Sequence, residues 1–151
     1  PFHHTHPTGS FGKEWMPKRV MDNGVDWKNC PALDIREYIY DMPTVMAAAD
    51  IVIGRAGSAT CNEIGASGTP CILIPSPNVT NNHQEKNARA LETHGGVEVL
   101  LEQDSSGQAL FQTAAGILRD DARREAMASA MAELGIRDAA QRIYETVQEL
   151  L

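Results

Sequence analysis

The chain has 151 residues and a formal net charge of -7 at pH 7, the length of one domain with room for a sizeable core. Its acidic balance, with no basic patch to offset it, argues against nucleic acid as a partner. The longest apolar runs are about one strand long, whereas a membrane span needs ~20 apolar residues, so we expect no bilayer crossing and no export leader. Three cysteines without C-x-x-C spacing predict free thiols with packing roles in a reducing cytoplasm.

The first nine residues (PFHHTHPTG) are typical of a strand end followed by a loop. Because the chain begins with Pro1 and not with methionine, we expect it to be a piece of a longer protein. His4 and His6 would share one face of an extended strand. Neither Cys, Asp nor Glu stands nearby to complete a ligand set, so we expect no metal site and favour a solvated or phosphate-facing loop.

Residues 12–21 predict a short helix, with Trp15, Met16 and Val20 spaced to bury one side. Residues 32–39 (ALDIREYI) then alternate well enough for a strand, with Tyr38 at its carboxyl end. Ligands of open parallel sheets bind outside that end. An aromatic ring there can stack on a base, but the residues alone favour a partly buried rim residue.

A further short helix is predicted from Asp41-Met42-Pro43 to Ala48, because proline in the first turn costs no hydrogen bond. The stretch that organises the chain follows it at residues 49–75. Its short apolar runs, bounded by Gly and Pro and separated by a helix-length segment, indicate a βαβ unit of a parallel sheet. We expect a strand at 50–54, a turn at 55–57, a helix at 58–66, a stop at Gly68 and a strand at 71–75.

The start of the helix at residue 58 is the first candidate site. Its N-terminus should lie at the carboxyl end of the sheet, where free N–H groups and the helix dipole attract anions. Gly57 allows close backbone approach, and Ser58 and Thr60 add hydroxyl donors. The spacing of Thr60 and Glu63 also matches a capping box, so a purely structural, well-capped helix is the alternative.

A second polar group opens the next helix, expected at residues 82–94 after a loop rich in turn formers. His83, Gln84 and Asn87 lie on its first turns, where their side chains can reach the same crevice; the alternative is an ordinary solvated helix start. A last strand is expected at 97–101 and helices at 107–118, 121–134 and 138–150. The final helix carries an apolar stripe that needs a surface, made of Ala139, Ile143, Val147 and Leu150.

The motifs, in this order and spacing, resemble those of the donor-binding, carboxyl-terminal half of the MurG family. These bacterial transferases move N-acetylglucosamine from UDP-GlcNAc onto the undecaprenyl-linked muramyl-pentapeptide carrier of peptidoglycan, for cell-wall growth and division. The resemblance rests on His-x-Thr-Gly at 6–9, Tyr-Ile-x-Asp-Met at 38–42, Ala-Asp-x-Val-Ile-x-Arg-Ala-Gly at 49–57, Glu63, and His83-Gln84 with Asn87.

The resemblance implies an α/β fold: a Rossmann-like parallel sheet with flanking helices, the donor domain of a GT-B glycosyltransferase, spanning residues 1–151 and lacking its first strand. It also assigns the binding residues. Tyr38 would lie against the uracil, with the Ile39 backbone reading its edge and Met42 nearby. Glu63 would bind the ribose hydroxyls. The remaining contacts would be Ser58, Ala59 and Thr60 to the diphosphate, and His83 and Gln84 to the sugar hydroxyls.

Several expectations concern what lies outside the chain. The acceptor domain, with the catalytic base and the lipid-linked substrate, has no counterpart here, so this chain alone should not work as an enzyme. The resemblance implies inverting transfer without metal or cofactor, and a cytoplasmic protein that contacts the inner membrane face through its missing domain. A stand-alone donor-binding subunit docking on a separate membrane-bound half, a related UDP-sugar lipid glycosyltransferase and an epimerase remain alternatives; an epimerase needs catalytic carboxylates that we cannot place.

Overall fold

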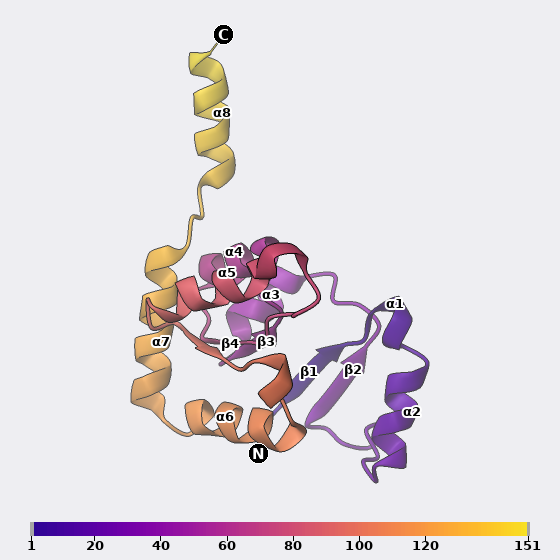
Figure 1. Ribbon diagram of the computed structural model, residues 1–151. Helices are drawn as coiled ribbons and strands as arrows, with labels where there is room; N and C mark the ends of the chain where they lie inside the picture. The colour runs from indigo at the N-terminus through magenta and orange to yellow at the C-terminus, as the bar shows by residue number, and fades with distance from the viewer. Residues whose placement is uncertain (1, 151) are drawn as a thin grey trace. The chain divides into compact units, whose positions relative to one another are not determined.

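The computed structural model describes residues 2–150 and divides the chain into two compact units, Pro1–Met42 and Pro43–Leu151. Each unit contains a parallel sheet with helices in its connections (Figure 1). The predicted fold class, a parallel α/β architecture with flanking helices, is therefore confirmed. The strands form two separate sheets, however, where one was expected.

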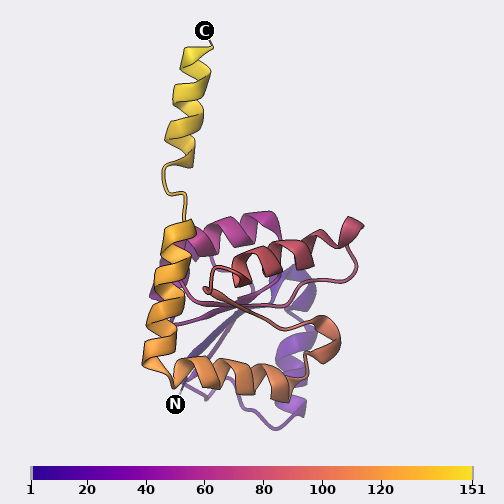
Figure 2. The same cartoon turned by 60° about the vertical axis from the view of Figure 1, so that its left-hand side comes forward.

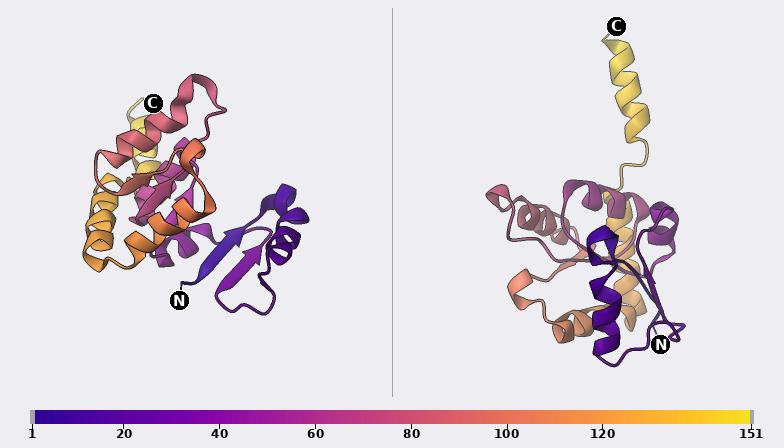
Figure 3. Two further views of the ribbon diagram at one scale, coloured as in Figure 1. Left: turned by 60° about the horizontal axis from the view of Figure 1, so that its bottom comes forward. Right: turned by 90° about the vertical axis from the view of Figure 1, so that its right-hand side faces the viewer.

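The first unit is a single βαβ crossover. Strand β1 (His4–Pro7) pairs in parallel with β2 (Leu33–Arg36), as Figure 3 shows. In their register His4 lies opposite Leu33. Helices α1 (Gly9–Gly12) and α2 (Trp15–Asp22) connect the two strands. β2 is shorter than predicted, and Tyr38 and Ile39 follow it instead of belonging to it.

The predicted burial of one side of α2 is wrong. Trp15 is 46% exposed, and every residue of α2 keeps at least part of its surface accessible. Helical spacing shows which side of a helix is apolar, but a sheet of two strands offers too narrow a surface to bury that side.

The second unit has the sheet order β3-β4-β5, with all strands parallel. Its strands are β3 (Val52–Gly54), β4 (Cys71–Leu73) and β5 (Val97–Val99). Its helical segments are α3 (Met42–Ala48), which begins at the last residue of the first unit, α4 (Ser58–Ser67), η1 (Thr80–Asn82), α5 (His83–Glu92), η2 (Glu102–Asp104), α6 (Gly107–Leu118), α7 (Asp121–Leu134) and α8 (Ala139–Glu149).

The core of this unit forms around the central strand β4. Helices α4 and α5 cover one face of the sheet and α6 covers the other (Figure 2). Ile72 of β4 packs with Ile117 of α6 and Met127 of α7, and all of β4 is buried. Burial on both faces explains why β4 is a continuous apolar run in the sequence. All three cysteines are free, and burial raises the pKa of the Cys71 thiol.

The described strands pair only within their own unit. β1 pairs only with β2, and both β3 and β5 pair only with the central strand β4.

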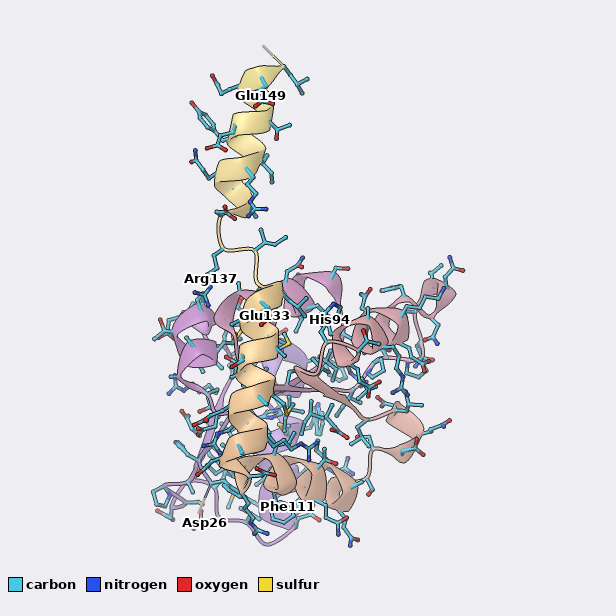
Figure 4. The ribbon with its side chains drawn as sticks, turned by 90° about the vertical axis from the view of Figure 1, so that its left-hand side faces the viewer. Asp26, His94, Phe111, Glu133, Arg137 and Glu149 are labelled. Carbon is cyan, nitrogen blue, oxygen red and sulfur yellow. The ribbon has the colours of Figure 1, made fainter. Side chains whose placement is uncertain are left out.

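The last helices match their predicted bounds closely. Ser106 and Asp120 cap α6 and α7, accepting hydrogen bonds from the N–H groups of Ala109 (3.0 Å) and Arg123 (2.9 Å). Arg137 lies in the link between α7 and α8 (Figure 4). Its Nε donates to the Ala66 carbonyl at 3.0 Å. The apolar stripe of α8 is exposed, as expected of a face without a surface to cover it. None of the helices between residues 2 and 150 combines the length and apolarity of a membrane span.

Candidate functional site

The turn between β3 and α4 presents open N–H groups at the carboxyl end of the three-stranded sheet. The N-cap of α4 is Gly57, whose φ of -68° and ψ of 150° are extended. The first helical hydrogen bond runs from the Cys61 N–H to the Gly57 carbonyl at 2.9 Å. The N–H groups of residues 58–60 precede that bond and therefore lack a helical acceptor. A Cβ added to Gly57 would meet no described atom within 4 Å, so the space before the turn is open.

The capping-box alternative for Glu63 is wrong. With Gly57 as the N-cap, Thr60 is the third helical residue and Glu63 the sixth, too far along α4 to return to the cap. Glu63 is exposed, and its carboxylate has no hydrogen-bond or ion-pair partner among residues 2–150. The structure thus leaves this carboxylate available to a ligand.

Arg55 ties the turn to two other strand ends. Its Nη1 donates to the Ile74 carbonyl, just after β4, at 3.1 Å, and its guanidinium pairs with Glu102 of η2, just after β5. The hydrogen bond from Arg55 lowers the pKa of the Glu102 carboxyl. Arg55 therefore orders the loops around the turn.

Two side chains on the first turns of α5 form hydrogen bonds to the loops that follow β3 and β4. Asn87 donates from Nδ2 to the Ala56 carbonyl at 3.1 Å. The Ser76 N–H donates to Oε1 of Gln84 at 2.9 Å. Since this bond fixes the amide oxygen of Gln84, its NH₂ group is the part left to donate to a ligand. A merely solvated helix start does not describe these two residues.

His83 is exposed beside this group. Its Nδ1 lies 3.0 Å from the Thr80 carbonyl. A carbonyl oxygen only accepts, so Nδ1 carries the proton and a neutral ring presents Nε2 as an acceptor. His83 and Gln84 together thus offer an acceptor and a donor, the pair of functions that recognises a hydroxyl group.

Two asparagines in the left-handed conformation precede α5, where the sequence predicted only a loop rich in turn formers. Asn81 has φ 55° and Asn82 has φ 50°, both in the left-handed region. Asparagine tolerates this conformation better than other residues with a side chain, and such conformations gather at ligand-binding loops. The Asn81-Asn82 pair is the signal in the sequence that points to this conformation.

The predicted base-binding residues belong to the first unit, directly after β2. Tyr38 is 62% exposed and Ile39 only 5% exposed, while Met42 begins α3 and is half-buried. The main-chain N–H and C=O of Ile39 form no hydrogen bond with any described residue. The nine predicted contact residues therefore lie in two groups, three at the end of the first unit and six in the second.

The histidines of β1 are partly shielded from water. The rings of His4 and His6 meet edge to face with centroids 5.6 Å apart. Desolvation lowers the pKa of both rings, and the charges of His6 and His3 lower that of His4 further. Among residues 2–150, no three potential ligand side chains converge on a metal position.

A shallow hollow of about 260 Å³ lies at the opposite, amino ends of β3 and β4. Its one cationic wall residue, Arg124, already pairs with Asp121 at 2.8 Å and Asp50 at 3.7 Å. The hollow thus offers no uncompensated charge to an anion, and the open helix N-terminus remains the better candidate.

Fold and site together define a class of protein. An open helix N-terminus at the carboxyl end of a parallel sheet binds phosphate groups. The same unit carries the Glu63 carboxylate, which has no partner among residues 2–150, and the side chains of Gln84 and His83 at the start of α5. Fold and helix terminus together are those of the parallel α/β domains in which anionic ligands bind beside the carboxyl ends of the strands.

The chain belongs to the glycosyltransferase family 28 C-terminal domain family, whose model matches residues 3–143. It is 45% identical over 121 residues to the UDP-N-acetylglucosamine--N-acetylmuramyl-(pentapeptide) pyrophosphoryl-undecaprenol N-acetylglucosamine transferase of Acetivibrio thermocellus, covering 80% of this chain and 33% of that protein. A Bacillus cereus protein with the same description, numbered 1, is 44% identical over 133 residues, covering 88% and 36%. The chain thus spans about a third of the length of these relatives.

Solved structures show the same fold. Acinetobacter baumannii MurG matches with a TM-score of 0.77 at 22% identity, over 96% of this chain and 42% of that one. The glycotransferase of kitacinnamycin matches with a TM-score of 0.66 at 20% identity, over 95% and 34%. Both likenesses extend along nearly the whole chain, which supports the GT-B donor-domain architecture expected from the motifs.

Proposed function

We propose that the chain is the UDP-GlcNAc-binding half of an inverting glycosyltransferase that adds N-acetylglucosamine to undecaprenyl-pyrophosphoryl-MurNAc-pentapeptide in peptidoglycan synthesis. The observation that carries the proposal is the open N-terminus of α4 in a chain of this family. One turn further on, Glu63 has no partner among residues 2–150. The substrate names come from the descriptions of the relatives.

The diphosphate of the donor would lie at the start of α4. The N–H groups of Ser58, Ala59 and Thr60, with the two hydroxyl groups, supply donors, and the helix dipole adds a positive field. Glu63 would accept from the two ribose hydroxyls, since its carboxylate is exposed and unpaired within the described residues.

The remaining proposed contacts are to the sugar and to the base of the donor. His83 and Gln84 would face the sugar hydroxyls and help to choose N-acetylglucosamine. In the first unit, Tyr38 would lie against the uracil, with the Ile39 main chain reading its edge and Met42 packing nearby. The free main-chain groups of Ile39 and the exposed ring of Tyr38 support this assignment.

In the reaction, the acceptor hydroxyl would attack the anomeric carbon while the bond from that carbon to the β-phosphate oxygen breaks. UDP leaves with the electron pair, and the N–H groups at the start of α4 stabilise the negative charge that develops on it. No metal or cofactor is needed if these groups supply the positive field. A base on the acceptor domain, outside this chain, would take the proton, and that domain would hold the protein on the cytoplasmic face of the membrane.

The test is transfer by the protein as encoded in full. We expect N-acetylglucosamine to pass from UDP-GlcNAc to a lipid-linked muramyl-pentapeptide, with UDP-glucose a poor donor. Efficient transfer from UDP-glucose, or transfer only to another lipid acceptor, would assign the chain instead to a related UDP-sugar lipid glycosyltransferase. Absence of UDP binding in a folded sample would refute the donor site itself.

The exposed apolar stripe of α8 favours a second candidate, a donor-binding subunit that acts after docking on a separate membrane-bound acceptor half. Reading the coding sequence upstream of Pro1 discriminates the two. An acceptor domain in the same reading frame supports a single-chain enzyme, and a start codon directly before Pro1 supports the separate subunit.

A further inference from the structure

A pair of exposed tyrosines stands at the carboxyl end of β2. Tyr38 is 62% exposed and Tyr40 is 92% exposed, while Ile39 between them is buried. The centroids of the two rings are 5.1 Å apart and the ring planes are tilted by 60°. This is a contact between the rings themselves, in the distance range at which aromatic side chains attract each other.

The backbone that carries the pair is held in place. The N–H groups of Thr8 and Gly9 donate to the carbonyls of Arg36 and Glu37 at 2.8 and 2.9 Å. The Glu37 carboxylate also pairs with Lys13 at 3.1 Å. These contacts fix the residues just before Tyr38, and burial of Ile39 fixes the next position.

Packing in the core is not the reason for an aromatic residue at position 40, because almost all of the Tyr40 side chain is accessible to water. An exposed aromatic side chain without a neighbour changes rotamer freely, and binding a ligand against it costs that freedom. Contact with Tyr40 restricts the rotamers of Tyr38 before any ligand arrives. Much of the Tyr38 surface stays exposed and can accept a flat partner.

We propose that Tyr40 is a positioning residue for nucleotide binding: by packing against Tyr38, it pre-orients the ring that stacks on the base of a uridine nucleotide. The inference rests on the proposed function and extends it to a residue outside the predicted contact set. Tyr40 acts through Tyr38 and does not itself touch the base.

A double-mutant cycle tests this, using UDP binding by calorimetry to the protein as encoded in full. Tyr40→Ala should weaken UDP binding about 2- to 10-fold, the range expected for loss of one aromatic pair. In a Tyr38→Ala background the same change should have no further effect, because the ring that it orients is gone. Tyr40→Phe should restore binding, since it keeps the ring contact, and Tyr40→Leu should not.

Matched controls separate this role from a general effect. Tyr144 on α8 is 59% exposed, and Tyr144→Ala should leave UDP binding unchanged. Inorganic pyrophosphate carries no base, so its binding should be equal in wild type and Tyr40→Ala. Equal melting temperatures and equal pyrophosphate binding would show that the variant is folded.

Two results would overturn the inference: wild-type UDP affinity in Tyr40→Ala, or an equal loss in the presence and absence of the Tyr38 ring. The second would mean that Tyr40 touches the ligand independently. If the wild-type protein does not bind UDP, both the proposed function and the role of Tyr40 are refuted. If it binds UDP and Tyr40→Ala binds UDP equally well, only the role of Tyr40 is refuted.

Discussion

Replacing Glu63 with alanine should damage donor binding without damaging the fold. The carboxylate is exposed and has no partner in the described part of the chain, and it stands too far along α4 to cap it. Removing it therefore breaks no contact of the folded protein, and the melting temperature should stay close to that of wild type. What is lost is acceptance from the two ribose hydroxyls.

Hydrogen bonds to a charged group contribute about 1.5 to 3 kcal/mol each when buried, and exposure to water at this site reduces that. We therefore expect a loss of roughly 1 to 3 kcal/mol, which is about a 5- to 150-fold fall in kcat/KM for UDP-GlcNAc. The assay is steady-state transfer by the protein as encoded in full. Glu133→Ala on α7 is the matched control, because Glu133 is likewise an exposed helical carboxylate (Figure 4).

A modified ligand makes the test sharper. The 2′-deoxyribose form of UDP-GlcNAc lacks one of the two hydroxyls, so wild type should bind it more weakly than UDP-GlcNAc. Glu63→Ala should bind the two ligands almost equally. Unchanged kinetics of Glu63→Ala together with a lower melting temperature would refute the reasoning and indicate a structural role for Glu63. The reasoning would also be refuted if Glu63→Ala still bound UDP-GlcNAc more tightly than its 2′-deoxyribose form.

Three further perturbations follow from the packing and charges. Gly135→Ala would place a Cβ 2.4 Å from the Gly65 carbonyl oxygen, so it should lower the free energy of unfolding by about 1 to 3 kcal/mol in chemical denaturation. Gly116→Ala is its control: it meets no described atom within 4 Å inside α6, so it should stabilise by about 0.5 to 1 kcal/mol. Desolvation lowers the pKa of His4 below 6.5, so the unfolded chain binds more protons than the folded chain in this pH range. The free energy of unfolding should therefore fall as the pH drops from 6.5 toward the folded pKa. This fall should be smaller in His4→Gln. Arg55→Ala should weaken UDP binding in calorimetry while changing the melting temperature little, because its ion pair is exposed.

Each of these has a clear contrary result. Equal stability of the two glycine variants would mean that α4 and α7 do not approach as closely as described. The desolvation argument would be refuted if the midpoint of urea unfolding did not change with pH. It would also be refuted if the midpoint shifted equally with pH in wild type and in His4→Gln. Wild-type affinity for UDP in Arg55→Ala would show that the loops keep their order without the guanidinium.

The elements that the sequence predicted best carry their signals locally. Helices at 107–118 and 121–134 are bounded by capping side chains, Ser106 and Asp120, immediately before a long periodic segment. The helix at residue 58 starts after Gly57 and ends at Gly68, whose φ of 70° suits glycine. These signals require no knowledge of distant residues.

What the sequence could not predict depends on partners far along the chain. The Thr60–Glu63 spacing fits a capping box equally well at the wrong position of a helix, and only the observed N-cap excludes it. The Arg55–Glu102 pair joins residues 47 positions apart. The division into two sheets depends on which strands pair with each other, and this pairing involves residues far apart in the sequence. The spacing of apolar residues in α2 does not show whether another element covers its apolar side.

The central claim is that the open N-terminus of α4 binds the diphosphate of UDP-GlcNAc. It is tested most directly by titrating UDP into the isotope-labelled protein and following the amide resonances by NMR. We expect the N–H signals of Ser58, Ala59 and Thr60 to shift most, with a second set at residues 38–42, and His83 to respond only when N-acetylglucosamine is attached. A folded protein whose α4 signals stay in place at saturating UDP, or shift only after those of the hollow beside Arg124, would contradict the account.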